Sequence, residues 1–165
     1  MHFELTQRFA APVADVADAF SDPGFYETLA QLPKLGRPEV LGREAEGSRV
    51  VMRVRYRFNG ELSSAARAVL DPAKLTWVEE SVHDLDTHQV TFVQVPDHYA
   101  DRFSCRGGYR FRAEGADHTV RDAEGDVKVR APLVASSVER AIISGLKDHL
   151  EEEVELLERW LAGTS

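Results

Sequence analysis

Cysteine, long hydrophobic runs and excess positive charge are what this sequence lacks. Cys105 is the single cysteine among 165 residues, which excludes an intrachain disulfide and is typical of a reducing compartment. No window approaches the roughly 18 consecutive apolar residues of a transmembrane helix. Residues 1–9 alternate polar and apolar side chains, so they lack the apolar centre of a signal peptide. We therefore expect a cytoplasmic protein with no integral membrane segment.

The net charge argues against a nucleic-acid partner. The chain has 28 acidic and 20 basic residues, a formal charge of −8, whereas nucleic-acid-binding proteins neutralise phosphates with clustered lysine and arginine. No internal repeat, low-complexity tract or linker interrupts the sequence, so residues 1–165 are predicted to form a single domain. The oligomeric state stays open at this point.

The fingerprints of common catalytic sites are absent as well. The sequence has no Walker loop, no G-x-G-x-x-G turn, no G-x-S-x-G elbow and no H-E-x-x-H helix. Two histidines and two aspartates occur between His83 and His88, but we interpret this segment as a polar turn between strands, where aspartate bonds its own backbone. No set of four metal ligands is evident from the spacing. We expect no structural metal, no cofactor, and an inert, inward-facing Cys105.

The patterns that are present predict one early strand, two short helices and then mostly strands. Residues 2–9 alternate as a half-buried strand does, Pro12 begins a helix that reaches Phe20, and a second short helix covers 25–32 and ends at Pro33. Alanine-rich residues 63–70 favour another short helix. Further strands are expected at 40–41, 49–58, 74–82, 88–96, 101–113 and 117–131.

One long amphipathic helix, residues 133–161, closes the chain. Its apolar stripe is best buried across the concave face of a curved antiparallel sheet. The predicted fold class is therefore α+β: a seven-stranded curved antiparallel sheet wrapped around a long C-terminal helix, with two short helices after the first strand. Around the turn at 114–117, we expect Phe103, Cys105, Tyr109 and Phe111 on the same side as Arg121.

Two junctions resemble a known superfamily. Phe9–Val16 leading into Phe20–Pro23, and Val127–Leu133 leading into Val138–Arg140, are similar to the strand-to-helix junctions of the START-like or SRPBCC superfamily. Trp77–Asp84 also resembles a segment of PRELI-type lipid-transfer proteins. The resemblance implies the helix-grip fold and a small bacterial branch of unknown function. Members bind lipids, sterols, polyketides or plant hormones, and some catalyse cyclisation or dehydration, so the fold does not choose among them.

The final helix carries the most informative polar pair. His149 and Glu153 are four residues apart and fall inside the apolar arc of the helix. Burying two ionisable side chains there costs free energy unless they form ion pairs or hydrogen bonds, or contact water. Inward-pointing Arg121 and Tyr109 could be their partners. Gly145, one turn before His149, has no side chain, so a ligand could approach the helix backbone closely there.

Three hypotheses follow. The first is a carrier of a small hydrophobic or amphipathic molecule, held in a cavity of a few hundred Å³ between helix and sheet. The second is a cyclase or dehydratase with His149 as acid or base and Tyr109 or Arg121 holding an oxyanion. The third is a cavity-less interaction module whose acidic residues Glu151, Glu152, Glu153 and Glu155 meet a basic partner. The expected ligand contacts are Met52, Val54, Tyr56, Phe103, Tyr109, Phe111, Arg121, Ile142, Gly145, His149 and Glu153.

Overall fold

A seven-stranded antiparallel sheet dominates the computed structural model, which describes residues 1–32, 36–59, 64–68 and 70–163. The strands run β1-β7-β6-β5-β4-β3-β2 across the sheet, so the first strand lies beside the last. Their bounds are β1 His2–Phe9, β2 Glu39–Glu46, β3 Arg49–Arg57, β4 Thr76–Asp84, β5 Gln89–Pro96, β6 Phe103–Ala113 and β7 Thr119–Val129.

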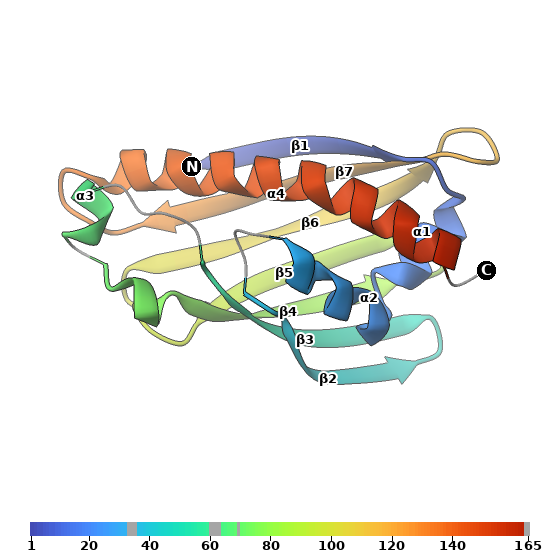
Figure 1. The fold of residues 1–165 in the computed structure, drawn as a ribbon, viewed down its shortest axis with the longest axis horizontal. Coiled ribbons are helices and arrows are strands. Elements are labelled where there is room, and N and C mark those ends of the chain that lie inside the picture. Colours follow the sequence, from blue (N-terminus) through green and yellow to red (C-terminus); the bar gives the residue numbers. More distant parts are fainter. Residues whose placement is uncertain (33–35, 60–63, 69, 164–165) are drawn as a thin grey trace.

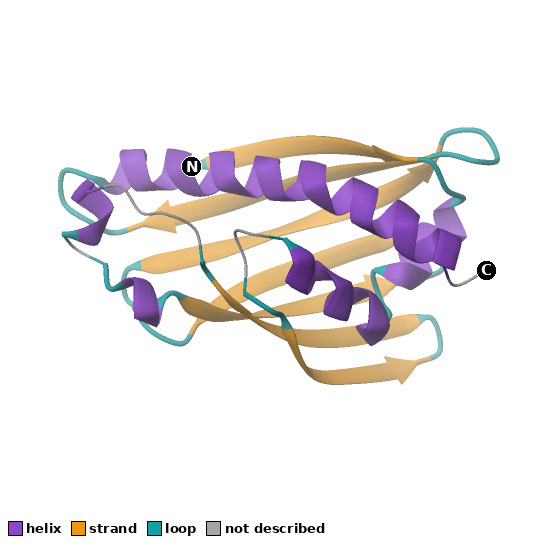
Figure 2. Cartoon of the chain, in the orientation of Figure 1, coloured by secondary structure: helices purple, strands orange, loops and turns teal. Residues whose placement is uncertain are grey.

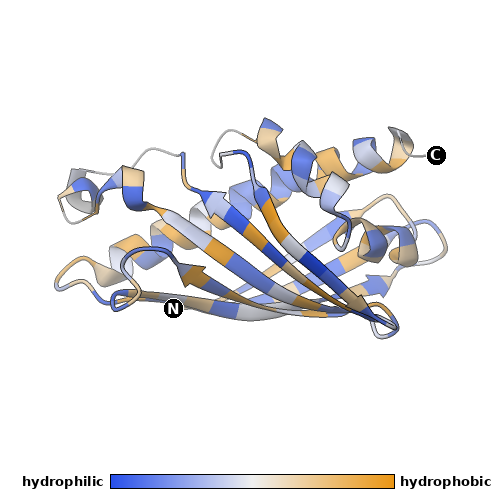
Figure 3. Cartoon of the chain, turned by 90° about the horizontal axis from the view of Figure 1, so that it is seen from below, coloured by the Kyte–Doolittle hydropathy of each residue, from blue (hydrophilic) through white to orange (hydrophobic). Residues whose placement is uncertain are grey.

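The helices lie against one side of this sheet, as Figures 1 and 2 show. Their bounds are α1 Val13–Ala19, α2 Pro23–Thr28, the 3-10 turn Leu29–Gln31, α3 Ser64–Arg67, the 3-10 turn Pro72–Lys74 and α4 Ala135–Gly163. Helix α4 follows β1 and β7, and α1 and α2 meet its C-terminal half. Viewed along the sheet, the strands curve beneath these helices (Figure 3). The predicted helix-grip α+β fold is confirmed.

Several element boundaries differ from the sequence prediction. Strand β2 has eight residues, Glu39–Glu46, where two were expected, because its pairing with β3 rather than any apolar alternation defines it. Strand β4 begins at Thr76, since the Asp71 carboxylate accepts a hydrogen bond from the Ala73 amide at 3.0 Å and starts a 3-10 turn before it. The second helix gives way to a 3-10 turn after Thr28.

The helix expected at 63–70 is present as α3, Ser64–Arg67. Residues 63 and 69 of that prediction, and Pro33, where the second helix was expected to end, lie outside the described residues.

Strand register decides which side chains reach the concave side. Phe111 pairs with Arg121, Cys105 with Val127 and Phe103 with Val129, so the predicted sharing of one side is confirmed. By the same alternation, Val50, Met52, Val54 and Tyr56 of β3 face this side with Trp77, Glu79, Ser81 and His83 of β4.

The buried core forms two separate clusters on this concave side. The larger lies under α1, α2 and the C-terminal half of α4, and its fully buried members include Phe9, Phe25, Leu29, Met52 and Leu157. The smaller centres on Phe3, Cys105 and Val127, with Ile142 and Leu146 of α4 packed against it. The helix is thus anchored to the sheet at two places along its length.

Candidate functional site

Side chains between the two clusters face inward yet remain partly accessible. They are Trp77, Glu79, Phe92, Gln94, Phe103, Tyr109, Ile142, Gly145 and Leu146. A Cβ built on Gly145 would meet nothing within 4 Å, so the surface of α4 is open there. This mixture of half-buried aromatic, aliphatic and polar groups is the composition of a small-molecule site.

Arg121 is the centre of a buried polar network at one end of this region. Its Nη2 donates to Glu153 Oε1 at 2.6 Å and its Nε donates to Gln7 Oε1 at 2.6 Å. Gln7 in turn donates to the Leu150 carbonyl of α4. The side chains of Arg121 and Glu153 are only 4% and 7% exposed. The network of Arg121, Glu153 and Gln7 therefore joins β7, α4 and β1 inside the protein.

His149 and Glu153 face the sheet, so their predicted orientation is confirmed. His149 is 9% exposed and its Nε2 lies 3.9 Å from Glu153 Oε2. Glu153 therefore cannot belong to an acidic outer surface, as the interaction-module hypothesis assumed, because Arg121 holds it inside.

Aromatic rings surround the Arg121 guanidinium. Its carbon lies 4.5 Å from the ring centroid of Phe20, 5.2 Å from that of Tyr109 and 5.6 Å from that of Phe9. Such a contact stabilises a desolvated cation by about 2 kcal/mol or more. Burial raises the pKa of the Tyr109 hydroxyl well above its usual value, although Arg121 acts in the opposite direction.

The predicted ligand contacts divide into two groups. Met52, Val54 and Phe111 are buried within the larger cluster, whereas Phe103, Ile142 and Gly145 remain partly accessible. Tyr56 is also buried in the larger cluster, stacked on the partly accessible Trp77 with ring centroids 5.7 Å apart and an interplanar angle of 20°. The ligand-binding role of all of them stays a prediction.

Two depressions of the surface lie outside the space between α4 and the sheet. One of about 520 Å³ lies between α1 and the end of α4, beside Asp15, Asp18 and Trp160. The other, about 760 Å³, opens mostly on the outer side of the sheet beside Arg53, Glu80 and Val93. Neither is the expected cavity between helix and sheet, which also stays a prediction.

Sequence reasoning missed Glu79. This half-buried residue lies on the concave side, and its Oε2 accepts a hydrogen bond from the Gln94 amide at 3.3 Å. Burial raises the pKa of Glu79, and the nearby Glu153 carboxylate adds to the effect. The signal in the sequence was the alternation of β4, which places Glu79 beside Trp77, Ser81 and His83.

The polar turn after β4 is present, but His83 is not part of it. The Asp84 carboxylate accepts hydrogen bonds from the amides of Asp86 and Thr87, both at 3.0 Å. His83 instead lies on the concave side, 1% exposed, with its Nε2 2.9 Å from Ser81 Oγ. Burial lowers the pKa of His83 to about 4. Burial also raises the pKa of Cys105 to about 12, which agrees with an inert thiol.

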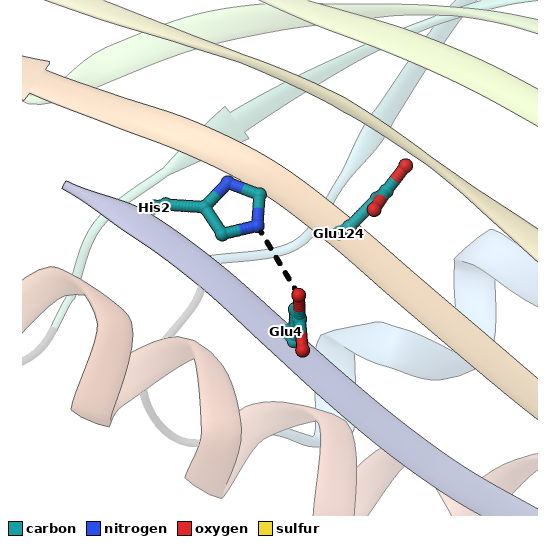
Figure 4. A group of neighbouring side chains, drawn as sticks. All are labelled: His2, Glu4 and Glu124. Carbon is teal, nitrogen blue, oxygen red and sulfur yellow. Dashed lines mark ion pairs between the residues drawn. The ribbon is translucent and has the colours of Figure 1, made fainter.

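A surface cluster of His2, Glu4 and Glu124 brings three potential metal ligands within 4.8 Å of one another (Figure 4). The sequence does not reveal it, because β1 and β7 are paired from opposite ends of the chain. All three residues are exposed, and His2 already contacts Glu4 at 3.5 Å and Asp126 at 3.4 Å. The arrangement is that of an ordinary surface ion-pair group.

The chain has the START-like helix-grip fold, which several solved structures share. A START superfamily protein from Mycobacterium smegmatis is 17% identical, with a TM-score of 0.57 and 99% of each chain covered. The Zhui aromatase/cyclase from Streptomyces sp. R1128 is 17% identical, with a TM-score of 0.67 over 98% of this chain and 93% of that chain. Norcoclaurine synthase from Thalictrum flavum, in complex with dopamine and hydroxybenzaldehyde, is 15% identical. Its TM-score is 0.67, over 100% of this chain and 88% of that chain.

The chain belongs to the family described as protein of unknown function DUF2505, whose model matches residues 4–161. A comparison with curated proteins gave no match. Among the described residues, no helix combines the length and apolarity needed to cross a membrane.

Proposed function

We propose that this protein binds a small hydrophobic or amphipathic molecule between the concave side of the sheet and helix α4. The observation that carries the proposal is the set of half-buried inward residues between the two core clusters, where Gly145 opens the surface of α4. A tightly packed interior would bury such side chains completely, because protein cores are close-packed. Here Phe92, Tyr109 and Ile142 stay accessible.

The solved structures that share this fold are consistent with such a ligand. One is an aromatase/cyclase. Another was solved with dopamine and hydroxybenzaldehyde, and these two ligands are small aromatic molecules. We expect the apolar part of the ligand to contact Tyr109, Phe103 and Ile142. Arg121, His149 and Glu153 would close the site at the end nearer the larger cluster.

Binding explains the arrangement of charges better than acid–base chemistry by His149. A general acid or base must reach the proton that it transfers, whereas His149 is 9% exposed and adjoins the buried Arg121–Glu153 pair. We therefore propose a carrier or sensor rather than a cyclase or dehydratase.

A blocking substitution in α4 tests the proposal. Gly145→Phe should fill the proposed site and lower the affinity for the neutral probe N-phenyl-1-naphthylamine by about tenfold or more, because ligand and side chain would occupy the same volume. Ser144→Phe is the matched control, since Ser144 is the exposed neighbour in the same helix. Fluorescence titration measures both affinities.

Equal probe binding by wild type and Gly145→Phe would refute the proposed site. If Gly145→Phe weakens probe binding as expected, mass spectrometry of small molecules extracted from the purified, undenatured wild type should identify the natural ligand. The same molecule should be missing from Gly145→Phe and present in Ser144→Phe.

A further inference from the structure

Glu79 places on the concave side a carboxyl group that the Arg121 network does not use. It lies on β4 between Val54 of β3 and Gln94 of β5. The Gln94 amide is its neutral hydrogen-bond donor, at 3.3 Å. Among the residues that the structure describes, no lysine or arginine forms an ion pair with this carboxylate. Glu79 differs in this respect from Glu153, which Arg121 contacts at 2.6 Å.

Arg121 does not balance the charge of an ionised Glu79 carboxylate. Arg121 contributes one positive charge, and its guanidinium already bonds Glu153 and Gln7. Ionised Glu79 would therefore leave one excess negative charge in a partly desolvated space. Burial is the main reason why the pKa of Glu79 is raised; the Gln94 hydrogen bond and Arg121 lower this pKa, and the Glu153 carboxylate raises it. A cation beside Glu79 would remove this penalty.

Aromatic side chains share the concave side with Glu79. Trp77 precedes Glu79 by two residues on the same face of β4 and stacks on Tyr56. Tyr109 of β6 also faces the concave side, and its ring is 6.4 Å from that of Phe92. Aromatic faces together with a carboxylate attract ammonium groups, because the ring quadrupole is negative above its plane.

Glu79 is also reachable. It is only half buried, in contrast to Arg121 and Glu153. A ligand in the proposed site can therefore contact Glu79 without breaking the Arg121–Glu153 pair.

We infer that Glu79 is the anchoring residue for the protonated amine of an aromatic or otherwise apolar ligand. The inference rests on the proposed function, because it names the head group of the molecule bound beneath α4. The apolar body of the ligand lies toward Tyr109 and Ile142, and the ammonium group donates hydrogen bonds to the Glu79 carboxylate.

Three probes with one apolar body and different head groups test this inference. They are 1-naphthylmethylamine, 1-naphthalenemethanol and 1-naphthoate, titrated by calorimetry at pH 7.5. Wild type should bind the amine about tenfold more tightly than the alcohol, and the carboxylate most weakly. Glu79→Gln should lose this tenfold preference and bind the alcohol as wild type does.

Glu80→Gln is the matched control on the same strand. Glu80 faces the outer side, where its carboxylate contacts Arg53 Nε at 3.1 Å, so this variant should keep the amine preference. Glu79→Gln should unfold at the same or a higher temperature at pH 7.5, because it removes a buried carboxyl whose raised pKa disfavours its ionised form. Its lost preference therefore would not reflect unfolding.

The outcomes separate the two proposals. If the probes bind wild type, compete with N-phenyl-1-naphthylamine and are blocked by Gly145→Phe, but show no amine preference, the inference about Glu79 is wrong and the proposed function stands. If Glu79→Gln keeps the amine preference, the inference about Glu79 is likewise wrong and the proposed function stands. If no probe binds and Gly145→Phe has no effect, the proposed function fails as well.

Discussion

Removing Glu153 should destabilise this protein far more than breaking an ion pair on its surface. Glu153→Leu would leave the Arg121 guanidinium buried without its carboxylate partner, 4% exposed and surrounded by Phe9, Phe20 and Tyr109. Removing one member of a buried pair costs about 3–5 kcal/mol. Since domains are stable by about 5–15 kcal/mol, this is a large fraction of the total.

The magnitude translates into a measurable shift. For a domain of this size each kcal/mol changes the melting temperature by about 2–4 °C, so Glu153→Leu should lower it by about 6–20 °C. Urea unfolding followed by tryptophan fluorescence and circular dichroism gives the corresponding free energy. The two signals should coincide if unfolding is two-state.

Asp122→Asn is the matched control, on β7 next to Arg121. Asp122 forms an equally short ion pair, 2.6 Å to Arg112 Nε, but both side chains are exposed, 53% for Arg112 and 43% for Asp122. Solvent screens such pairs, so the substitution should cost about 0–1 kcal/mol.

The double variant Arg121→Met, Glu153→Leu completes the test. Replacing both charges by apolar side chains should recover most of the stability that the single variant loses, because no unpaired charge remains inside. If Glu153→Leu costs no more than Asp122→Asn, or if the double variant is as unstable as the single one, the reasoning about the buried pair is wrong.

Four further predictions concern single residues. Gly145→Ala should stabilise the protein by about 0.5–1 kcal/mol in urea unfolding, because alanine favours the helix and its Cβ meets nothing within 4 Å; a loss of stability would show that the space is filled. Stability should fall as the pH drops from 6.5 toward 4, because the pKa of His83 is about 4 in the folded protein and near 6.5 when unfolded; His83→Leu should flatten this part of the pH profile, and an unchanged slope would contradict the assignment. Cys105, whose pKa is raised to about 12, should react with a thiol reagent at pH 8 only after unfolding; fast reaction of the native protein would contradict its burial. Elemental analysis should find no stoichiometric zinc, and zinc that disappears in Glu4→Ala would assign a metal site to the His2 cluster.

Local patterns in the sequence determined most of the fold. Alternation predicted β1 at residues 2–9, and the structure has His2–Phe9. The apolar arc predicted the final helix within two residues at each end, 133–161 against Ala135–Gly163. The same arc predicted that His149 and Glu153 face the sheet. These features depend on neighbours only one helical turn or two strand residues away, so periodicity is sufficient to find them.

Features that depend on strand order were beyond the sequence. Strand β2 has little apolar alternation, and its eight residues become a strand only by pairing with β3. His83 was assigned to a turn because of the aspartates that follow it, whereas pairing opposite Val50 and Val90 places it inside. The His2, Glu4 and Glu124 cluster requires the pairing of β1 with β7.

The candidate site shows the same division. The sequence by itself selected Arg121 as an inward-facing residue and His149 and Glu153 as an inward pair, because each follows from the period of its own element. Only the tertiary structure decided that Arg121 bonds Glu153 and Gln7, so that their charges are already balanced. It also decided that Glu79, although equally inward by alternation, has no such cation among the described residues. Which charged side chains form ion pairs depends on which strands and helices become neighbours. The packing of the whole chain determines these neighbours.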